Sequence, residues 1–284
     1  MKPAYMILWR VLAYPALVYL VFSLIFFYLY VHPRRHISEF KPSDFGSKFD
    51  QVRFAASDGV SLAGWFIPNK NSKKALVICH GYPMDKGNVY GMTYFLAKDF
   101  NLLLFDFRAM GSSGGFFSTA GAKETGDVDA AIAFLADKGF KKVGLFGFSM
   151  GASAILMSDN PAVAARVADS PFADIGGELD YIFKEYGAFR YPLIRLMKVW
   201  SVLFLGVNMD RVSPLRRAAG IRTPLLLIHG ASDTQVPVQA SLALKAAVPG
   251  AELWIIKGAD HGETWAAAGY PYEKKVIEFF QKNL

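Results

Sequence analysis

The sequence predicts an α/β fold: an eight-stranded, mostly parallel sheet with helices on both faces, a small helical cap insertion and an apolar N-terminal helix. Short apolar runs typical of buried strands alternate with helical stretches. Such alternation places parallel strands between two layers of helices. The expected strands are residues 49–54, 62–67, 75–79, 102–106, 143–148, 164–169, 224–228 and 252–256.

The first two strands differ from the others because only a short connection joins them. Residues 57–59, Ser-Asp-Gly, form a turn signal between 49–54 and 62–67, which predicts an antiparallel pair. Later connections carry apolar side chains at helical spacing, as in 124–138 and 272–284. Loops at the carboxyl ends of the parallel strands should therefore gather at one edge and hold any functional residues.

One connection is longer than a single helix requires. Residues 174–208 separate the sixth and seventh expected strands and are rich in apolar and aromatic side chains. A cap of this composition would line an acyl-binding pocket or touch a bilayer. The alternative is that the segment simply covers the sheet.

The N-terminal segment has the length of a membrane span. From Val11 to Val31 the chain has 21 consecutive residues without a charge, and about 20 apolar residues cross a bilayer. A cleaved signal peptide is the alternative, but its apolar core is shorter and its cleavage site has small residues, which are missing here. We expect an anchor at 1–31, a connector at 32–48 and one globular domain at 49–284, with a cap at about 174–208. Basic residues flank the anchor on both sides, so charge does not decide its orientation.

The pentapeptide Gly147-Phe148-Ser149-Met150-Gly151 stands between an expected strand and a helix-compatible run. In this context G-x-S-x-G forms a nucleophile elbow, a sharp turn that exposes the serine hydroxyl above the sheet. The following helix N-terminus would offer the backbone N–H of Met150 to a developing oxyanion. Ser149 is therefore the candidate nucleophile.

An acid and a histidine follow in the order that such a serine requires. Asp233 comes after the seventh expected strand and His261 after the eighth. An imidazole removes the serine proton, and a carboxylate orients that imidazole. Asp169, after the sixth strand, is the rival acid, whereas Asp260 reads as a loop-capping residue because adjacent side chains rarely meet in this geometry.

Four other histidines receive non-catalytic interpretations. His80 and His229 each end a strand before a glycine, where structural hydrogen bonding is expected. His32 and His36 follow the apolar segment, where they would be solvated at an interface.

These motifs together resemble the α/β-hydrolase superfamily of serine hydrolases, and are similar to its Bem46-type membrane-anchored, esterase-like members. The resemblance covers 49–284 and includes Cys79-His80-Gly81-Tyr82, where it implies that the N–H of Tyr82 is the second oxyanion donor. It also includes 106–115, similar to a D-x-R-G-x-G-x-S-x-G loop in which Ala109 replaces the usual glycine, and 168–172.

Composition narrows the function further. The formal net charge of +7 comes from scattered basic residues, without the aromatic-interleaved stripe typical of nucleic-acid binding. Metal-ligand spacing, a cofactor motif and a second cysteine beside Cys79 are not found, so no metal, cofactor or intrachain disulfide is expected. We expect a membrane-anchored serine hydrolase that cleaves a small-molecule or lipid ester, with the anchor leaving the chemistry to 49–284. Amide or thioester hydrolysis by the same triad, and a non-catalytic membrane scaffold, are the alternatives.

Overall fold

The computed structural model describes residues 2–284, with side-chain surroundings from Trp9 onward. Its centre is one eight-stranded sheet in the order β1-β2-β4-β3-β5-β6-β7-β8. Only β2 runs antiparallel to its neighbours, so the mostly parallel sheet predicted from the sequence is confirmed. The strands are β1 Asp50–Ala55, β2 Ser61–Ile67, β3 Ala75–Cys79, β4 Asn101–Phe105, β5 Val143–Phe148, β6 Val163–Asp169, β7 Leu225–Gly230 and β8 Glu252–Ile256.

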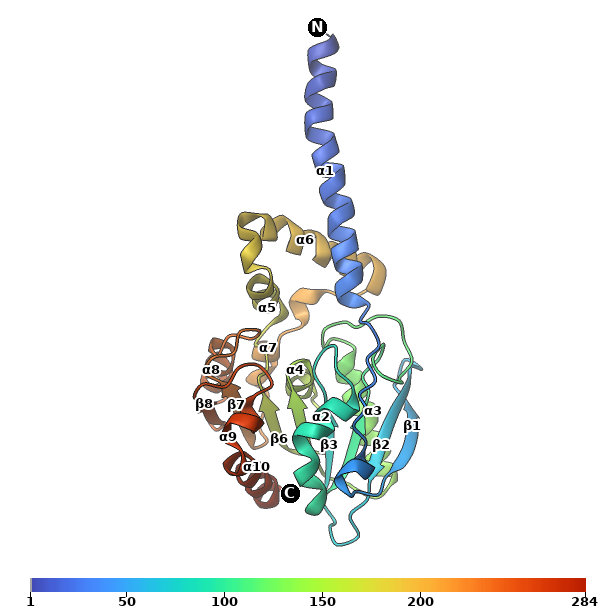
Figure 1. The fold of residues 1–284 in the computed structure, drawn as a ribbon, viewed down its shortest axis with the longest axis vertical. Helices are drawn as coiled ribbons and strands as arrows, with labels where there is room; N and C mark the ends of the chain where they lie inside the picture. The colour runs from blue at the N-terminus through green and yellow to red at the C-terminus, as the bar shows by residue number, and fades with distance from the viewer. Residues whose placement is uncertain (1) are drawn as a thin grey trace.

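Helices cover both faces of the sheet (Figure 1). In β3 the side chains alternate between two apolar layers, because successive residues of a strand point to opposite faces. Val77 and Cys79 pack in one layer, and Leu76 and Ile78 pack in the other. The helices around the sheet are α2 Lys86–Thr93, α3 Glu124–Asp137, α4 Met150–Met157, α7 Pro214–Ala218, α8 Gln239–Ala247, α9 Thr264–Ala268 and α10 Tyr270–Asn283.

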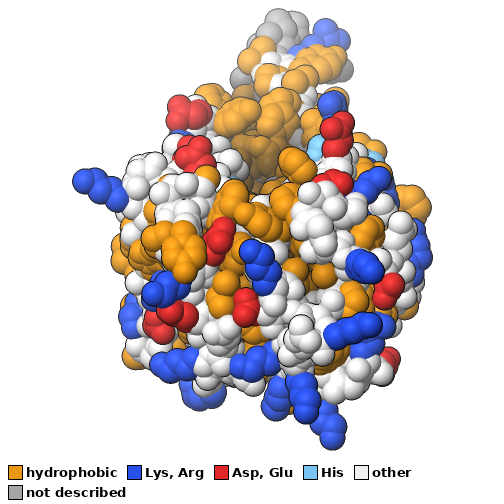
Figure 2. Space-filling model, turned by 60° about the horizontal axis from the view of Figure 1, so that its bottom comes forward, with side chains coloured by type: hydrophobic (Ala, Val, Ile, Leu, Met, Phe, Trp, Pro, Cys, Tyr) orange, Lys and Arg blue, Asp and Glu red, His pale blue; other side chains and the backbone are white. Residues whose placement is uncertain are grey.

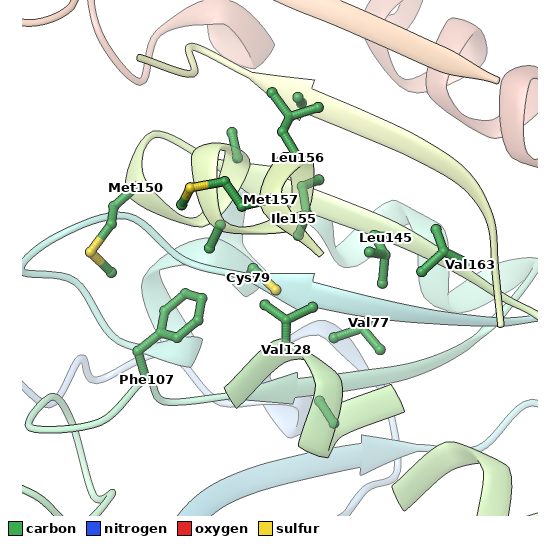
Figure 3. Packing of buried hydrophobic residues seen from close by; sticks show 14 of the residues in the cluster. Val77, Cys79, Phe107, Val128, Leu145, Met150, Ile155, Leu156, Met157 and Val163 are labelled. Atoms are coloured by element: carbon green, nitrogen blue, oxygen red, sulfur yellow. The ribbon is translucent and has the colours of Figure 1, made fainter. Parts of the chain in front are cut away.

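The first layer contains the packing that supports the elbow. Figure 3 shows side chains of β3, β5 and α4 meeting around Val77, Leu145 and Ile155, with Val128 of α3 beside them. These residues are fully buried. The strand before Ser149 and the helix after it are therefore held by one close-packed core.

The long connection after β6 forms a small helical cap, as predicted. It contains α5 Ile175–Ile182, a short helix at Lys184–Phe189, α6 Arg190–Trp200 and a further turn at Ser201–Leu205. In Figure 1 the cap lies above the sheet, beside the lower end of the N-terminal helix.

The N-terminal helix, α1, runs from Lys2 to Val31 and projects away from the rounded body (Figure 1). Within it, Trp9–Val31 is long and apolar enough to cross a membrane, and only 11% of its most apolar window is buried. Figure 2 shows charged side chains spread over the body, while the projecting helix is mainly hydrophobic. A core helix would be mostly buried, so this helix presents its apolar surface to an environment outside the fold.

The lower half of α1 packs against the cap. Phe27 and Val31 share an apolar cluster with residues of the cap that include Leu193 and Met197. Two hydrogen bonds join the same elements: Trp200 Nε1 donates to Ser23 Oγ at 3.0 Å, and Tyr19 Oη donates to the Phe189 carbonyl at 2.5 Å. The helix is therefore attached to the cap along about three turns.

Candidate active site

Ser149 lies on a strained turn between β5 and α4. Its backbone angles are φ 53° and ψ −118°, a region that non-glycine residues rarely occupy. Only glycine fits on either side: a Cβ at Gly147 would lie 2.5 Å from the Gly151 carbonyl oxygen, and a Cβ at Gly151 would lie 2.5 Å from the carbonyls of Cys79 and His80. The turn therefore requires the G-x-S-x-G sequence that marks it.

The structure brings Ser149, His261 and Asp233 into one hydrogen-bonded line. Ser149 Oγ lies 3.0 Å from His261 Nε2, and His261 Nδ1 lies 2.8 Å from Asp233 Oδ2. Since an ionised carboxylate only accepts, Nδ1 carries the proton and Nε2 is free to accept from the serine hydroxyl. This arrangement has the geometry needed to remove a proton from Ser149.

Asp233 is held in its ionised form by donors around it. Its other oxygen, Oδ1, accepts from the backbone N–H groups of Gln235 at 2.9 Å and Val236 at 2.7 Å. Burial alone would raise the pKa of Asp233, but hydrogen bonds from His229, His261 and Val236 outweigh it and hold the pKa well below its usual range. A carboxylate in this state stabilises an imidazolium at His261.

The two expected oxyanion donors face the same cavity as Ser149. Tyr82 and Met150 both line it. Neither backbone N–H donates a hydrogen bond within residues 2–284, whereas that of Ser149 is taken up by the Asp169 carbonyl at 2.8 Å. Unpaired N–H groups beside a nucleophile can bind a developing oxyanion.

Asp169, the rival acid, has other partners. Its carboxylate accepts from Thr264 Oγ1 at 2.5 Å, Tyr272 Oη at 2.7 Å and Ser170 Oγ at 3.0 Å, and within the described chain it makes no hydrogen bond to His261. It joins the end of β6 to α9 and α10.

Asp260 and the other histidines have structural roles. Asp260 accepts from the backbone N–H of Thr234 at 2.7 Å, so its interpretation as a loop-capping residue is confirmed. His80 Nε2 accepts from the Phe107 N–H at 2.9 Å, and His229 Nε2 lies 3.0 Å from the Val236 carbonyl. His229 also lies 3.4 Å from Asp233, a contact that the sequence did not reveal. His32 is exposed and its Nδ1 lies 2.8 Å from the Phe116 carbonyl.

Comparison with known proteins decides the family. The model of the alpha/beta hydrolase family matches residues 76–271. This chain belongs to that family. It is similar to YqkD of Bacillus subtilis, at 29% identity over 78% of this chain and 75% of that one, and to YfhR of Escherichia coli strain K12, at 28% identity over 95% of both. The Pyrococcus furiosus esterase Pf2001 has a similar structure, with a TM-score of 0.74 and 28% identity over 89% of this chain and 99% of that one. The family and this esterase structure together identify the chain as a hydrolase.

In the loop after β4 of this hydrolase, the alanine at position 109 causes backbone strain. Ala109 has φ 62°, a conformation that favours glycine, so the alanine is strained there. Arg108, nearly buried, pairs with Asp127 at 2.6 Å and with Asp58 at 2.6 Å. These ion pairs fix the loop around the strained residue, and none of them involves Ser149, His261 or Asp233.

The cavity of the hydrolase has a volume of about 440 Å³, within the range of roughly 300–1,000 Å³ usual for small-ligand sites. Its floor contains Ser149 and His261, and the cap supplies part of its wall, through residues that include Ile175, Leu179 and Met197. The expectation that the cap would line a pocket is therefore confirmed.

Two features of the cavity escaped sequence reasoning. Phe27, Tyr30 and Val31 of α1 line it, so the cavity wall extends beyond 49–284, although Ser149, His261 and Asp233 all lie within that range. Glu178 of α5 also faces it, without a hydrogen-bond partner among residues 9–284. Burial, together with the charges of Asp233 and Asp174, raises the pKa of Glu178 to about 8. Only the folding of the cap over the sheet reveals either feature.

Within residues 2–284 the side chains of His, Cys, Asp and Glu form no group of three that could hold a metal ion. The single cysteine, Cys79, is buried in β3, where burial raises the pKa of its thiol. It lies beneath the site and packs among apolar side chains.

Proposed function

We propose that this hydrolase cleaves carboxylic esters through a covalent intermediate on Ser149. The observation that carries the proposal is the line of hydrogen bonds from Ser149 through His261 to Asp233, at 3.0 Å and 2.8 Å, on a strained elbow at the floor of an apolar cavity. The similarity to the Pyrococcus furiosus esterase, over nearly its whole length, supports an ester substrate.

The proposed reaction has two balanced halves. Ser149 Oγ bonds to the ester carbonyl carbon while its proton moves to His261 Nε2, and the alcohol leaves with that proton when the C–O bond breaks. Water then bonds to the acyl carbon while one of its protons moves to His261. The bond between the acyl carbon and Ser149 Oγ breaks, the carboxylic acid leaves, and His261 returns the proton to Ser149 Oγ. Asp233 stabilises the imidazolium, and the N–H groups of Tyr82 and Met150 stabilise the oxyanion, each such donor contributing about 3 kcal/mol.

Ser149→Ala tests this proposal directly. We expect the variant to lose turnover of p-nitrophenyl esters and labelling by a fluorophosphonate, because both need the serine oxygen. Ser158→Ala, at the other end of α4, is the matched control and should keep both. Normal turnover by Ser149→Ala would remove the triad assignment, and wild-type protein inert toward esters, thioesters and amides would favour the scaffold alternative.

Amide hydrolysis is the second candidate, favoured by one observation. Glu178 places a carboxyl group in a mainly apolar cavity, and the ammonium group of an aminoacyl substrate would lower its raised pKa and pair with the carboxylate. Comparing p-nitrophenyl esters of graded chain length with aminoacyl p-nitroanilides separates the two. Faster cleavage of the anilides, abolished by Glu178→Gln, would assign the peptidase-like activity.

A membrane location is the second part of the proposal. The segment 1–31 anchors the chain, 32–48 connects it, and 49–284 holds the triad. The support is the length, apolarity and exposure of Trp9–Val31. The wild-type protein should then resist extraction by carbonate and high salt and yield to detergent. Release by carbonate alone, or a mature N-terminus beyond residue 31, would exclude the anchor.

A further inference from the structure

We propose that the last turns of α1 form part of the substrate site, and that the cavity accepts the long acyl chain of an ester that enters from the bilayer alongside this helix. This inference rests on the proposed esterase function of the same cavity and names its substrate class. It assigns α1 a role in binding in addition to anchoring.

The first argument is the shared cavity. Phe27 and Val31 of α1 line the same space as Ser149 and His261, and their side chains are only 5% and 6% exposed. Tyr30, between them, lines it too. A helix that served only as a tether would end outside this wall.

The second argument is that the end of α1 is fixed to the site. Tyr82 Oη donates to the Tyr30 carbonyl at 2.8 Å, and the Ser118 N–H donates to the Val31 carbonyl at 2.7 Å. Tyr82 also supplies a proposed oxyanion N–H. The helix end and the oxyanion loop are therefore joined by a single residue.

The third argument is the apolar surface that leads outward from the cavity. Phe27 lies between the cavity and the outer surface, with its ring centroid 6.3 Å from that of Phe204 of the cap. Phe204 is 61% exposed, and its neighbours Val202 and Leu203 are 52% and 66% exposed. Large apolar patches of this kind mark a contact surface, and here the patch is continuous with a helix long enough to span a bilayer.

The length of α1 sets the depth of this patch. The 23 residues of Trp9–Val31 extend about 35 Å at 1.5 Å per residue, slightly more than the ~30 Å hydrocarbon core. The cap contacts α1 from Tyr19 downward. If α1 spans the bilayer, the cap and its patch reach the near leaflet, and an acyl chain can pass into the cavity without crossing water.

The first test is chain-length selectivity of the full-length protein in phosphatidylcholine vesicles. The measured quantity is kcat/KM for p-nitrophenyl dodecanoate divided by that for p-nitrophenyl butyrate. Val31→Phe places a larger side chain in the wall and narrows the cavity, so it should lower this ratio at least tenfold. Leu29→Phe makes a similar change on an exposed side of the same helix, 59% exposed and outside the cavity, and should leave the ratio unchanged.

A second pair of variants with smaller side chains covers the case in which Val31→Phe does not fold. Tyr30→Ala removes an apolar contact from the wall and should lower the ratio at least threefold, while Tyr28→Ala, 50% exposed and outside the cavity, should not change it. Wild-type ratios in both Val31→Phe and Tyr30→Ala would overturn the inference while leaving the esterase proposal intact. Absence of all ester turnover in the wild type, with Ser149 unlabelled by fluorophosphonate, would instead defeat the proposed function.

The second test addresses the route. At a fixed bulk concentration of the dodecanoate, added phosphatidylcholine dilutes the ester within the bilayer. The rate should fall with its mole fraction in the vesicle if the substrate enters from the membrane. A rate that follows the concentration in water would contradict the proposed route.

Discussion

The ends of β6 and β7 carry two buried carboxylates that differ in almost everything except burial. Asp169 is fully buried and Asp233 is 7% exposed. Three hydroxyl groups surround Asp169, and burial raises its pKa. Two backbone N–H groups and the imidazoles of His229 and His261 surround Asp233, and its pKa is lowered despite burial.

Hydrogen-bond partners, rather than depth of burial, therefore distinguish Asp169, which has a structural role, from Asp233, the candidate catalytic acid. Neutral hydroxyl groups donate hydrogen bonds to the carboxylate oxygens of Asp169, but they do not compensate the cost of burying its negative charge. Fixed N–H donors beside Asp233 stabilise a charge that can then act on His261.

Replacing each acid by its amide should lower kcat by very different amounts. Asp233→Asn should lower kcat on the order of 10⁴-fold, because the amide favours the wrong tautomer of His261. Asp169→Asn should lower kcat less than tenfold, since the amide can keep hydrogen bonds to its hydroxyl partners. Steady-state kinetics on a short p-nitrophenyl ester measures both, and the reverse ranking would move the acid to β6.

Removing the structural acid altogether should affect stability. Asp169→Ala leaves the hydroxyls of Thr264, Tyr272 and Ser170 without their acceptor, so the free energy of unfolding should fall by roughly 1–3 kcal/mol or more. Denaturant unfolding of the detergent-solubilised protein measures this change. Asp169→Asn is the control: it keeps hydrogen-bonding groups at this position and should therefore lose much less stability than Asp169→Ala. Equal stability of Asp169→Ala and wild type would contradict the structural role.

A third carboxyl, Glu178, extends the comparison to pH. Its pKa is raised to about 8, whereas an unfolded glutamate titrates near ~4.3. Between these values the folded state binds more protons, so its stability contribution falls as pH rises through that window. Glu178→Gln should therefore gain thermal stability relative to wild type from pH 5 to 8, with a constant difference above 8.

Exposed Glu185 of the cap provides the control, since Glu185→Gln should leave the pH dependence of the melting temperature unchanged. A Glu178→Gln curve parallel to that of the wild type between pH 5 and 8 would show that this carboxyl titrates normally.

Local sequence was sufficient for the sheet and much of the site. Gly147 is required by backbone contacts with Gly151 and Ala152, within five residues, so this half of the elbow is a local signal. Gly151 is required by the carbonyls of Cys79 and His80 at the end of β3, a contact between distant segments. Strand boundaries lay within two residues of those predicted: β7 continues to Gly230 because its last residues still pair with β8.

Contacts between distant segments were beyond such reasoning. The distinction between Asp233 and Asp169 depends on which residues of α9 and α10 reach β6, some 95 to 103 positions away. The place of α1 in the cavity wall depends on how the cap folds back, and a uniformly apolar helix carries no pattern that marks its packed face.

The most direct test of the central claim is to trap the acyl-enzyme. The full-length protein is mixed with p-nitrophenyl butyrate, quenched in acid within the first turnovers, digested and analysed by mass spectrometry. We expect a butyryl group on the peptide that contains Ser149, greatly reduced in His261→Ala and missing in Ser149→Ala. Turnover without any adduct, or an adduct on another residue such as Cys79, would contradict it.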